Sequence, residues 1–239
     1  MILVVLVFSA IALFLTFVYM HQNATRLILT TIFGIALVAS LVLVIENDSQ
    51  HLGMTKVTTT KTVPLKSAGS SQMDMLLYQS IGTADKNRVY IYKTMTDQKK
   101  VSTTKANVNT ANHVKTTTGS TKLVTKTTRW MYQSNAAKFW FGIANNDNQL
   151  IKRTNTFYIQ KTWVVLSTSQ AKQLSKLAKQ QSTTLKAQAK VYVQNAVKTA
   201  MVKNPAMTQA QMATLEKQAA AQYQAKAMQN MIKTVKQSK

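Results

Sequence analysis

The first 45 residues contain two apolar runs joined by a short polar connection. Residues 2–20 and 27–45 carry no charged side chain, and each run is 19 residues long. A helix of that length extends roughly 28 Å, which is enough to cross the hydrocarbon layer of a bilayer. Because a backbone in lipid must satisfy its own hydrogen bonds, the pattern predicts two transmembrane helices.

Two other interpretations of these runs fit the residues less well. A signal peptide would have Lys or Arg before its apolar core and small residues at a cleavage site after it, and residues 1–23 have neither. A buried core helix is the alternative for the second run, but that run is long and apolar on all sides.

The connection at residues 21–26 is so short that the two helices are expected to be antiparallel neighbours. Small side chains on both runs permit a close approach, although another membrane protein could use them instead; they are Ser9, Ala12, Gly34, Ala36 and Ser40.

From residue 46 to residue 168 the pattern changes to short runs of β-branched and aromatic residues. The predicted strands are 56–65, 75–80, 88–94, 123–132, 138–143, 151–159 and 162–167. Turns are expected at 82–87 and 145–148, and Gln160-Lys161 could close a further hairpin. About seven short strands fit a small antiparallel β domain, either a sandwich or a partial barrel.

Two parts of this β-rich region need separate interpretations. Residues 97–122 contain only three large apolar residues, all isolated valines, and are therefore expected to form a mobile, solvated loop. The three tryptophans, Trp130, Trp140 and Trp163, are expected in the core of the domain rather than on an aromatic binding surface.

Residues 169–239 are rich in Ala, Gln, Lys and Leu and predict a basic amphipathic helical hairpin. Capping boxes at 167–170 and 208–211 begin the two helices, and Asn204-Pro205 ends the first near residue 203. In the first helix the apolar positions are Leu174, Ala178, Leu185, Tyr192 and Ala196. The opposite face carries the candidate contacts for an anionic surface: Lys172, Lys176, Lys179, Lys186 and Lys190. A solvated face that only keeps the helix soluble is an equal alternative.

Charge narrows the class of partner. The formal net charge is +23, from 30 Lys and Arg against 7 Asp and Glu, and Arg26 is the only basic residue before Glu46. Such a cationic segment is expected to meet anionic lipid, an anionic wall polymer or nucleic acid. Nucleic acid is the less favoured partner, because Lys greatly outnumbers Arg and no nucleic-acid-binding motif is present.

Residues that carry common catalytic or cofactor chemistry are scarce. The chain has no cysteine, which excludes disulfides, thiolate metal sites and a thiol nucleophile. His21, His51 and His113 are not spaced as metal ligands, and no glycine-rich phosphate loop is present. We therefore expect no enzyme activity, metal or cofactor. A cleft lined by Asp74, Asp85 or Asp147 with a shifted pKa would instead favour an enzyme that acts on an envelope polymer.

Only a few charged residues near the two apolar runs indicate the orientation of the protein in the membrane. Arg26 in the connection favours a cytoplasmic position for that loop, which would place both termini outside the cell. The sequence thus predicts a two-span protein of the cell membrane with an extracellular soluble domain.

Several segments resemble an uncharacterised family of small membrane proteins from lactic acid bacteria, domain-of-unknown-function family 4811. They are MDMLLYQSIGT (73–83), VYIYKT (89–94), LVTKTTRWMY (123–132) and KRTNTFYIQKTWVVLST (152–168). The resemblance implies a bacterial cytoplasmic membrane and transfers no catalytic residue.

These observations together predict an α+β membrane protein that is not an enzyme. Its basic domain would bind anionic envelope components or act as an accessory to another membrane protein. The alternatives are a cytosol-facing tether for nucleic acid or ribosomes, and the envelope-polymer enzyme.

Overall fold

The computed structural model describes residues 1–69, 73–82, 87–96 and 100–237. The chain forms two compact units, which are treated separately below. Unit 1 comprises 1–63, 107–116 and 120–158, and unit 2 comprises 64–106, 117–119 and 159–239.

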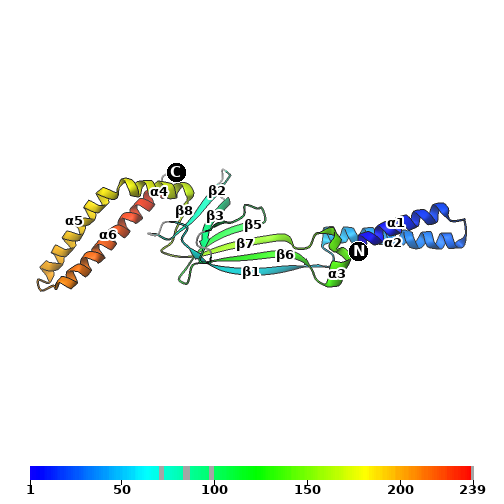
Figure 1. Ribbon diagram of the computed structural model, residues 1–239, viewed down its shortest axis with the longest axis horizontal. Helices are drawn as coiled ribbons and strands as arrows, with labels where there is room; N and C mark the ends of the chain where they lie inside the picture. Colours follow the sequence, from blue (N-terminus) through cyan, green and yellow to red (C-terminus); the bar gives the residue numbers. More distant parts are fainter. Residues whose placement is uncertain (70–72, 83–86, 97–99, 238–239) are drawn as a thin grey trace. The chain divides into compact units, whose positions relative to one another are not determined.

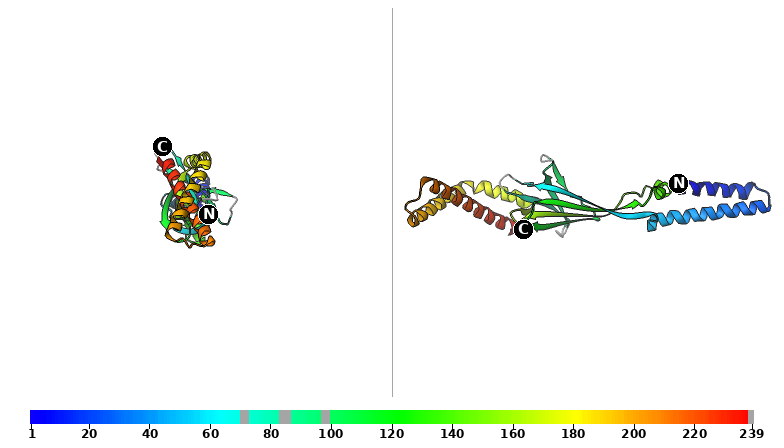
Figure 2. Two further views of the ribbon diagram at one scale, coloured as in Figure 1. Left: turned by 90° about the vertical axis from the view of Figure 1, so that its left-hand side faces the viewer. Right: turned by 90° about the horizontal axis from the view of Figure 1, so that it is seen from below.

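Unit 1 begins with two antiparallel helices, α1 (Ile2–Tyr19) and α2 (Ala24–Gln50) (Figures 1 and 2). Both are long and apolar enough to cross a membrane, and only 17% of the first apolar window and 6% of the second are buried inside the structure. Two apolar helices are thus present where the sequence predicts them. The second continues past residue 45 until His51, which adopts a left-handed conformation (φ 60°) and ends it.

The two helices pack through small and polar side chains. Ser9, Thr16 and Ser40 are buried, while most large apolar side chains of both helices are exposed. Two of the three hydroxyls bond within their own helices, since Thr16 Oγ1 donates to Leu13 O (3.0 Å) and Ser40 Oγ donates to Ala36 O (2.7 Å). The expected close approach at Ser9 and Ser40 is thus present within the hairpin.

Four strands of unit 1 lie in the order β5-β7-β6-β1. Their bounds are β1 (Met54–Lys66), β5 (Thr110–Thr117), β6 (Lys122–Tyr132) and β7 (Gln149–Gln160). A polar chain crosses three of them: Thr125 Oγ1 donates to Asn155 Oδ1 (2.9 Å), and Asn155 Nδ2 donates to Asn112 Oδ1 (2.8 Å). Asn155 is buried, so these bonds satisfy an amide that would otherwise destabilise the sheet.

The structure contradicts the predicted strand at residues 138–143. A short helix, α3 (Asn135–Phe141), and a 3-10 turn, η1 (Gly142–Ala144), occupy these positions. Ser134 caps α3, because its Oγ accepts a hydrogen bond from Ala137 N (3.1 Å). A six-residue apolar run does not distinguish a strand from a helix by periodicity alone, and the cap and the alanines before it decide for helix.

Unit 2 contains the end of β1 and four further strands in the order β1-β3-β2-β8, with β4 paired to β3. Their bounds are β2 (Met75–Ile81), β3 (Asn87–Thr94), β4 (Val101–Thr103) and β8 (Val164–Ser167). β2 and β3 are antiparallel, as predicted, although residues 83–86 of the expected turn lie outside the described residues. β8 runs parallel to β2, with Leu76 opposite Val165, so the β region is mixed and Gln160-Lys161 does not close a hairpin.

The expected loop at 97–122 is also wrong in part. Residues 101–103 form β4 and residues 110–117 form β5, while 97–99 lie outside the described residues. Few apolar side chains are needed here, because a strand is held chiefly by its backbone bonds and Thr suits the pleated surface. One backbone hydrogen bond next to β5 runs from Arg153 N to Asn109 O (2.7 Å).

The C-terminal residues of unit 2 form α4 (Thr168–Gln180), α5 (Ser182–Lys203) and α6 (Gln209–Gln237). Both predicted capping boxes are present, at Ser167 with Gln170 and at Thr208 with Gln211. α5 and α6 form the expected hairpin, in which the rings of Tyr192 and Tyr223 lie 5.5 Å apart. The single helix expected from 169 to 203 is instead divided at Gln181 into α4 and α5.

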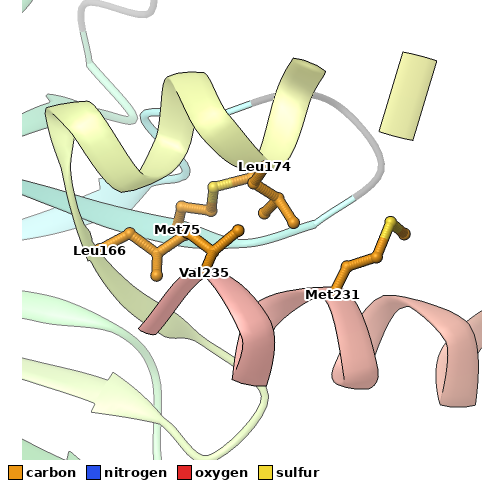
Figure 3. Close-up of a cluster of buried hydrophobic side chains, with 5 residues drawn as sticks. All are labelled: Met75, Leu166, Leu174, Met231 and Val235. Carbon is orange, nitrogen blue, oxygen red and sulfur yellow. The ribbon is translucent and has the colours of Figure 1, made fainter. Parts of the chain in front are cut away.

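The core of unit 2 is a cluster in which β2, β8, α4 and α6 meet. Figure 3 shows its five buried side chains: Met75, Leu166, Leu174, Met231 and Val235. The expected tryptophan core is not observed, because Trp140 is 43% exposed and Trp130 and Trp163 are half-buried. The overall layout of two apolar helices, a β region and C-terminal helices is as predicted.

Candidate functional site

The five lysines singled out in the sequence are all exposed and lie on two helices. Lys172, Lys176 and Lys179 belong to α4, and Lys186 and Lys190 belong to α5. The five lysines are therefore divided between two helices, which meet at Gln181. Of the five, Lys186 lines a groove and the other four do not.

This groove, with a cavity volume of about 1210 Å³, lies within unit 2 between the C-terminal helices and the segment that leads into β8. Its wall is mainly apolar, formed by Met73, Trp163, Val164, Ala178, Leu185, Ala189, Ala221, Ala225, Ala227, Met228, Met231 and Ile232. Four lysines also line it, Lys161, Lys186, Lys233 and Lys236. Among the described residues that line the groove, none is acidic.

The helix periodicity of α6 explains this combination. Met228, Met231 and Ile232 are spaced by three and four residues and face the core cluster, to which Met231 itself belongs. Lys236 follows Ile232 by four residues, so its aliphatic stem lies beside the apolar wall while its ammonium reaches solvent. The groove can therefore hold an apolar chain and an anion at the same time.

Sequence reasoning missed Lys161, Lys233, Lys236 and Trp163 as members of this site. Lys236 follows the apolar stripe of α6 at helical spacing, four residues after Ile232, and this spacing was the available signal; Lys233 carries none, because Gln229 and Asn230 precede it by four and three residues. Lys161 and Trp163 carry no such signal, because a non-local strand pairing brings them to the helices.

A second polar arrangement lies in unit 1, at the end of α2. Tyr132 OH donates to Asn146 Oδ1. Asn146 Nδ2 donates to Asn47 Oδ1 (2.9 Å), and Asn47 Nδ2 donates to Leu52 O (2.7 Å). Asn47 is only 2% exposed, so the chain of bonds ties the end of α2 to the end of β6 and the turn before β7.

One ion pair lies next to this chain of bonds. Lys138 Nζ is 3.1 Å from Asp147 Oδ2, and the hydrogen bond from Lys138 lowers the pKa of the Asp147 carboxyl below its ordinary value of 3.8. Burial, followed by the charge of Asp147, raises the pKa of the Tyr132 phenol, whose OH donates to Asn146.

The sign of the Asp147 shift predicts a small acid sensitivity. Because the folded pKa is lower than the unfolded one, the stabilisation is complete well above pH 3.8 and is lost as the pH falls below that value. We expect Asp147→Asn to make the unfolding temperature of the full chain less dependent on pH below 3.8. An unchanged pH dependence in the variant would contradict this expectation.

The other residues considered for catalysis are not brought together. Asp74 is exposed, Asp85 lies outside the described residues, and Asp147 is paired with Lys138. His51 stacks on Trp130, with ring centroids 4.1 Å apart. Within the described residues, no group of three or more His, Asp or Glu side chains is placed to hold a metal ion.

Comparison with known proteins identifies one family. A family model described as "Domain of unknown function (DUF4811)" matches residues 22–174. No curated protein and no solved structure matches the chain significantly.

Proposed function

Because the chain belongs to the DUF4811 family, whose description names no activity, we propose a function from its geometry. The protein is a non-enzymatic binding protein held in the cell membrane by α1 and α2. Its groove binds an anionic amphiphile of the cell envelope, a lipid with an acyl chain and a phosphate-bearing headgroup.

The membrane part of the proposal is supported by the surface of the helical hairpin. Most large side chains of α1 and α2 are apolar and exposed, and the described parts of the chain leave them uncovered. Such a surface is stable in lipid and is costly in water. We place the soluble part outside the cell, on the charge of Arg26 in the connection.

The residues that line the groove are the basis for the proposed class of ligand. An apolar wall alone would suit any hydrophobic molecule, and lysines alone would suit any polyanion. Together they favour a molecule with both properties, because the acyl chain displaces water from the wall while the phosphate meets the ammonium groups. Lysine is suited to this role because it binds phosphate as a mobile point charge without demanding one geometry.

The charge of the surrounding helices supports the same partner. Residues 169–239 contain 12 lysines, no arginine and a single acidic residue, Glu216. This surplus attracts an anion to the helices over about a Debye length, and it should be screened by salt.

The proposal is tested with the full chain in nanodiscs of zwitterionic lipid and a water-soluble short-chain phosphatidylglycerol as ligand. Trp163 lines the groove, so its fluorescence reports binding once Trp130 and Trp140 are replaced by Phe in every protein compared. Replacing Lys186, Lys233 and Lys236 together by Gln should weaken binding by about threefold to 150-fold, since exposed ion pairs contribute roughly 0.2–1 kcal/mol each. Short-chain phosphatidylcholine should bind weakly to both proteins.

The matched control removes the same charge from the same two helices at positions that do not line the groove. Lys190, Lys217 and Lys226 are replaced by Gln, and binding should change by less than about twofold at 0.15 M salt. Equal loss in both triple variants would show that overall charge, not the groove, binds the lipid. Equally tight binding of polyphosphate or single-stranded DNA, which have no acyl chain, would also overturn the proposal.

A further inference from the structure

The short helix α3 lies at the same end of the hairpin as the start of α1. The amino group of Met1 donates to the carbonyl oxygens of Phe139 and Trp140, both at 2.8 Å. Figure 2 shows the N-terminus beside this segment, at the end of α1 opposite the connection to α2. Since the apolar run begins at Ile2, α3 and η1 are level with the beginning of that run.

One side of α3 packs against the protein. A Cβ on Gly53 would lie 3.3 Å from Ala137 Cβ and 3.6 Å from the Phe141 ring, so the backbone of the α2–β1 turn contacts α3 closely. Gln133 N donates to Gly53 O (3.1 Å) just before α3 begins. The chain of bonds through Asn47 then fixes the turn that follows η1.

The other side of this segment is apolar and uncovered. Phe139 is 59% exposed, Trp140 is 43% exposed and Ile143 is 55% exposed. Three large apolar side chains grouped on α3 and η1 are unfavourable in water, and their grouping indicates a contact surface. Their position at the start of α1 indicates which surface they meet.

We propose that α3 and η1 form an interfacial anchor, with Phe139, Trp140 and Ile143 inserted into the boundary between headgroups and acyl chains. Trp and other aromatic residues favour this layer, where their rings contact both apolar and polar surroundings. The proposal rests on the membrane part of the proposed function and is independent of the groove.

The opposite end of the hairpin supports the same placement. Tyr19 is exposed there, and Arg26 Nη2 donates to Phe17 O (2.8 Å) while its guanidinium lies 5.1 Å from the Phe17 ring centroid. The 18 residues of α1 extend about 27 Å between the two aromatic ends. That length corresponds to one hydrocarbon thickness, so each aromatic end falls at an interface.

The test uses the natural absence of cysteine, because any introduced cysteine is the only thiol in the chain. Ile143→Cys, Lys152→Cys on β7 and Val38→Cys on α2 are each spin-labelled in full-length protein reconstituted into vesicles. For each spin label we compare two collision rates. One is with oxygen, which concentrates in lipid, and the other is with a nickel chelate that stays in water. We expect the label at position 143 to show several-fold less contact with nickel than the label at position 152, and oxygen contact between the values at positions 152 and 38.

Each outcome is decisive. If nickel reaches the labels at positions 143 and 152 equally while the label at position 38 is in lipid, the anchor proposal is wrong. The membrane hairpin would still be supported in that case. A label at position 143 shielded from both reagents indicates a covering protein and also overturns the anchor. A label at position 38 open to nickel would show that the hairpin is not in the membrane, and the proposed function itself would fail.

Discussion

Leu166→Ala is expected to destabilise unit 2 by about 2–5 kcal/mol, the range for truncating a fully buried leucine. Leu166 is 0% exposed and lies in the cluster that joins β8 to α4 and α6. The substitution removes contacts with side chains on both helices and leaves a cavity that cannot close fully, because each neighbour is held by a different element.

The measurement is hydrogen exchange of the full chain in detergent micelles, followed by mass spectrometry. Protection of α4 and of the C-terminal end of α6 should fall together, since both helices pack on Leu166. Val202→Ala is the control, because Val202 is 83% exposed and its truncation should change stability by less than about 0.5 kcal/mol. Unchanged protection of α4 in Leu166→Ala would contradict the assignment of this cluster as the core.

Asn47→Ala is expected to have the second-largest effect, about 1–3 kcal/mol in all, because it leaves two partly buried polar groups without their partner. The substitution removes the acceptor of Asn146 Nδ2 and the donor to Leu52 O, both within unit 1. Asn146 and the turn after α2 would no longer be linked by hydrogen bonds. We expect the local stability of α3 to fall as well.

Hydrogen exchange again measures this effect, now in the peptides that cover residues 51–54 and 135–148. Asp48→Ala is the matched control, because Asp48 is the next residue of α2 and is exposed. Faster exchange in both peptides for Asn47→Ala alone is the expected result. If the two variants behave alike, the chain of bonds from Tyr132 to Leu52 contributes nothing to the stability of this end of the hairpin.

The two proposals use different parts of the chain and different physical effects. The groove in unit 2 is expected to bind an amphiphile through lysine charge and an apolar wall, so salt should weaken the binding. The segment at α3 is expected to bind lipid through aromatic and aliphatic insertion, which salt affects little. A salt titration of both readouts in the same reconstituted protein therefore separates them.

Local patterns in the sequence determined much of the architecture. The two apolar runs, the capping boxes at Ser167 and Thr208 and the hairpin of C-terminal helices were all predictable, because helix periodicity and caps involve residues only a few positions apart. The same holds for most strands, whose β-branched and aromatic runs were recognised between residues 54 and 167.

The tertiary structure decided what depends on distant residues. Trp140 lies on an exposed helix rather than in a core strand, because Ser134 caps that segment and it packs on Gly53. β8 pairs in parallel with β2, and no local turn sequence next to β8 predicts this pairing. The pairing brings Lys161 and Trp163 to the groove. Of the five lysines that the helix pattern singled out, the packing of α5 against α6 places only Lys186 at that groove. Sequence periodicity reports which face of a helix is apolar, but only packing between elements determines what that face meets.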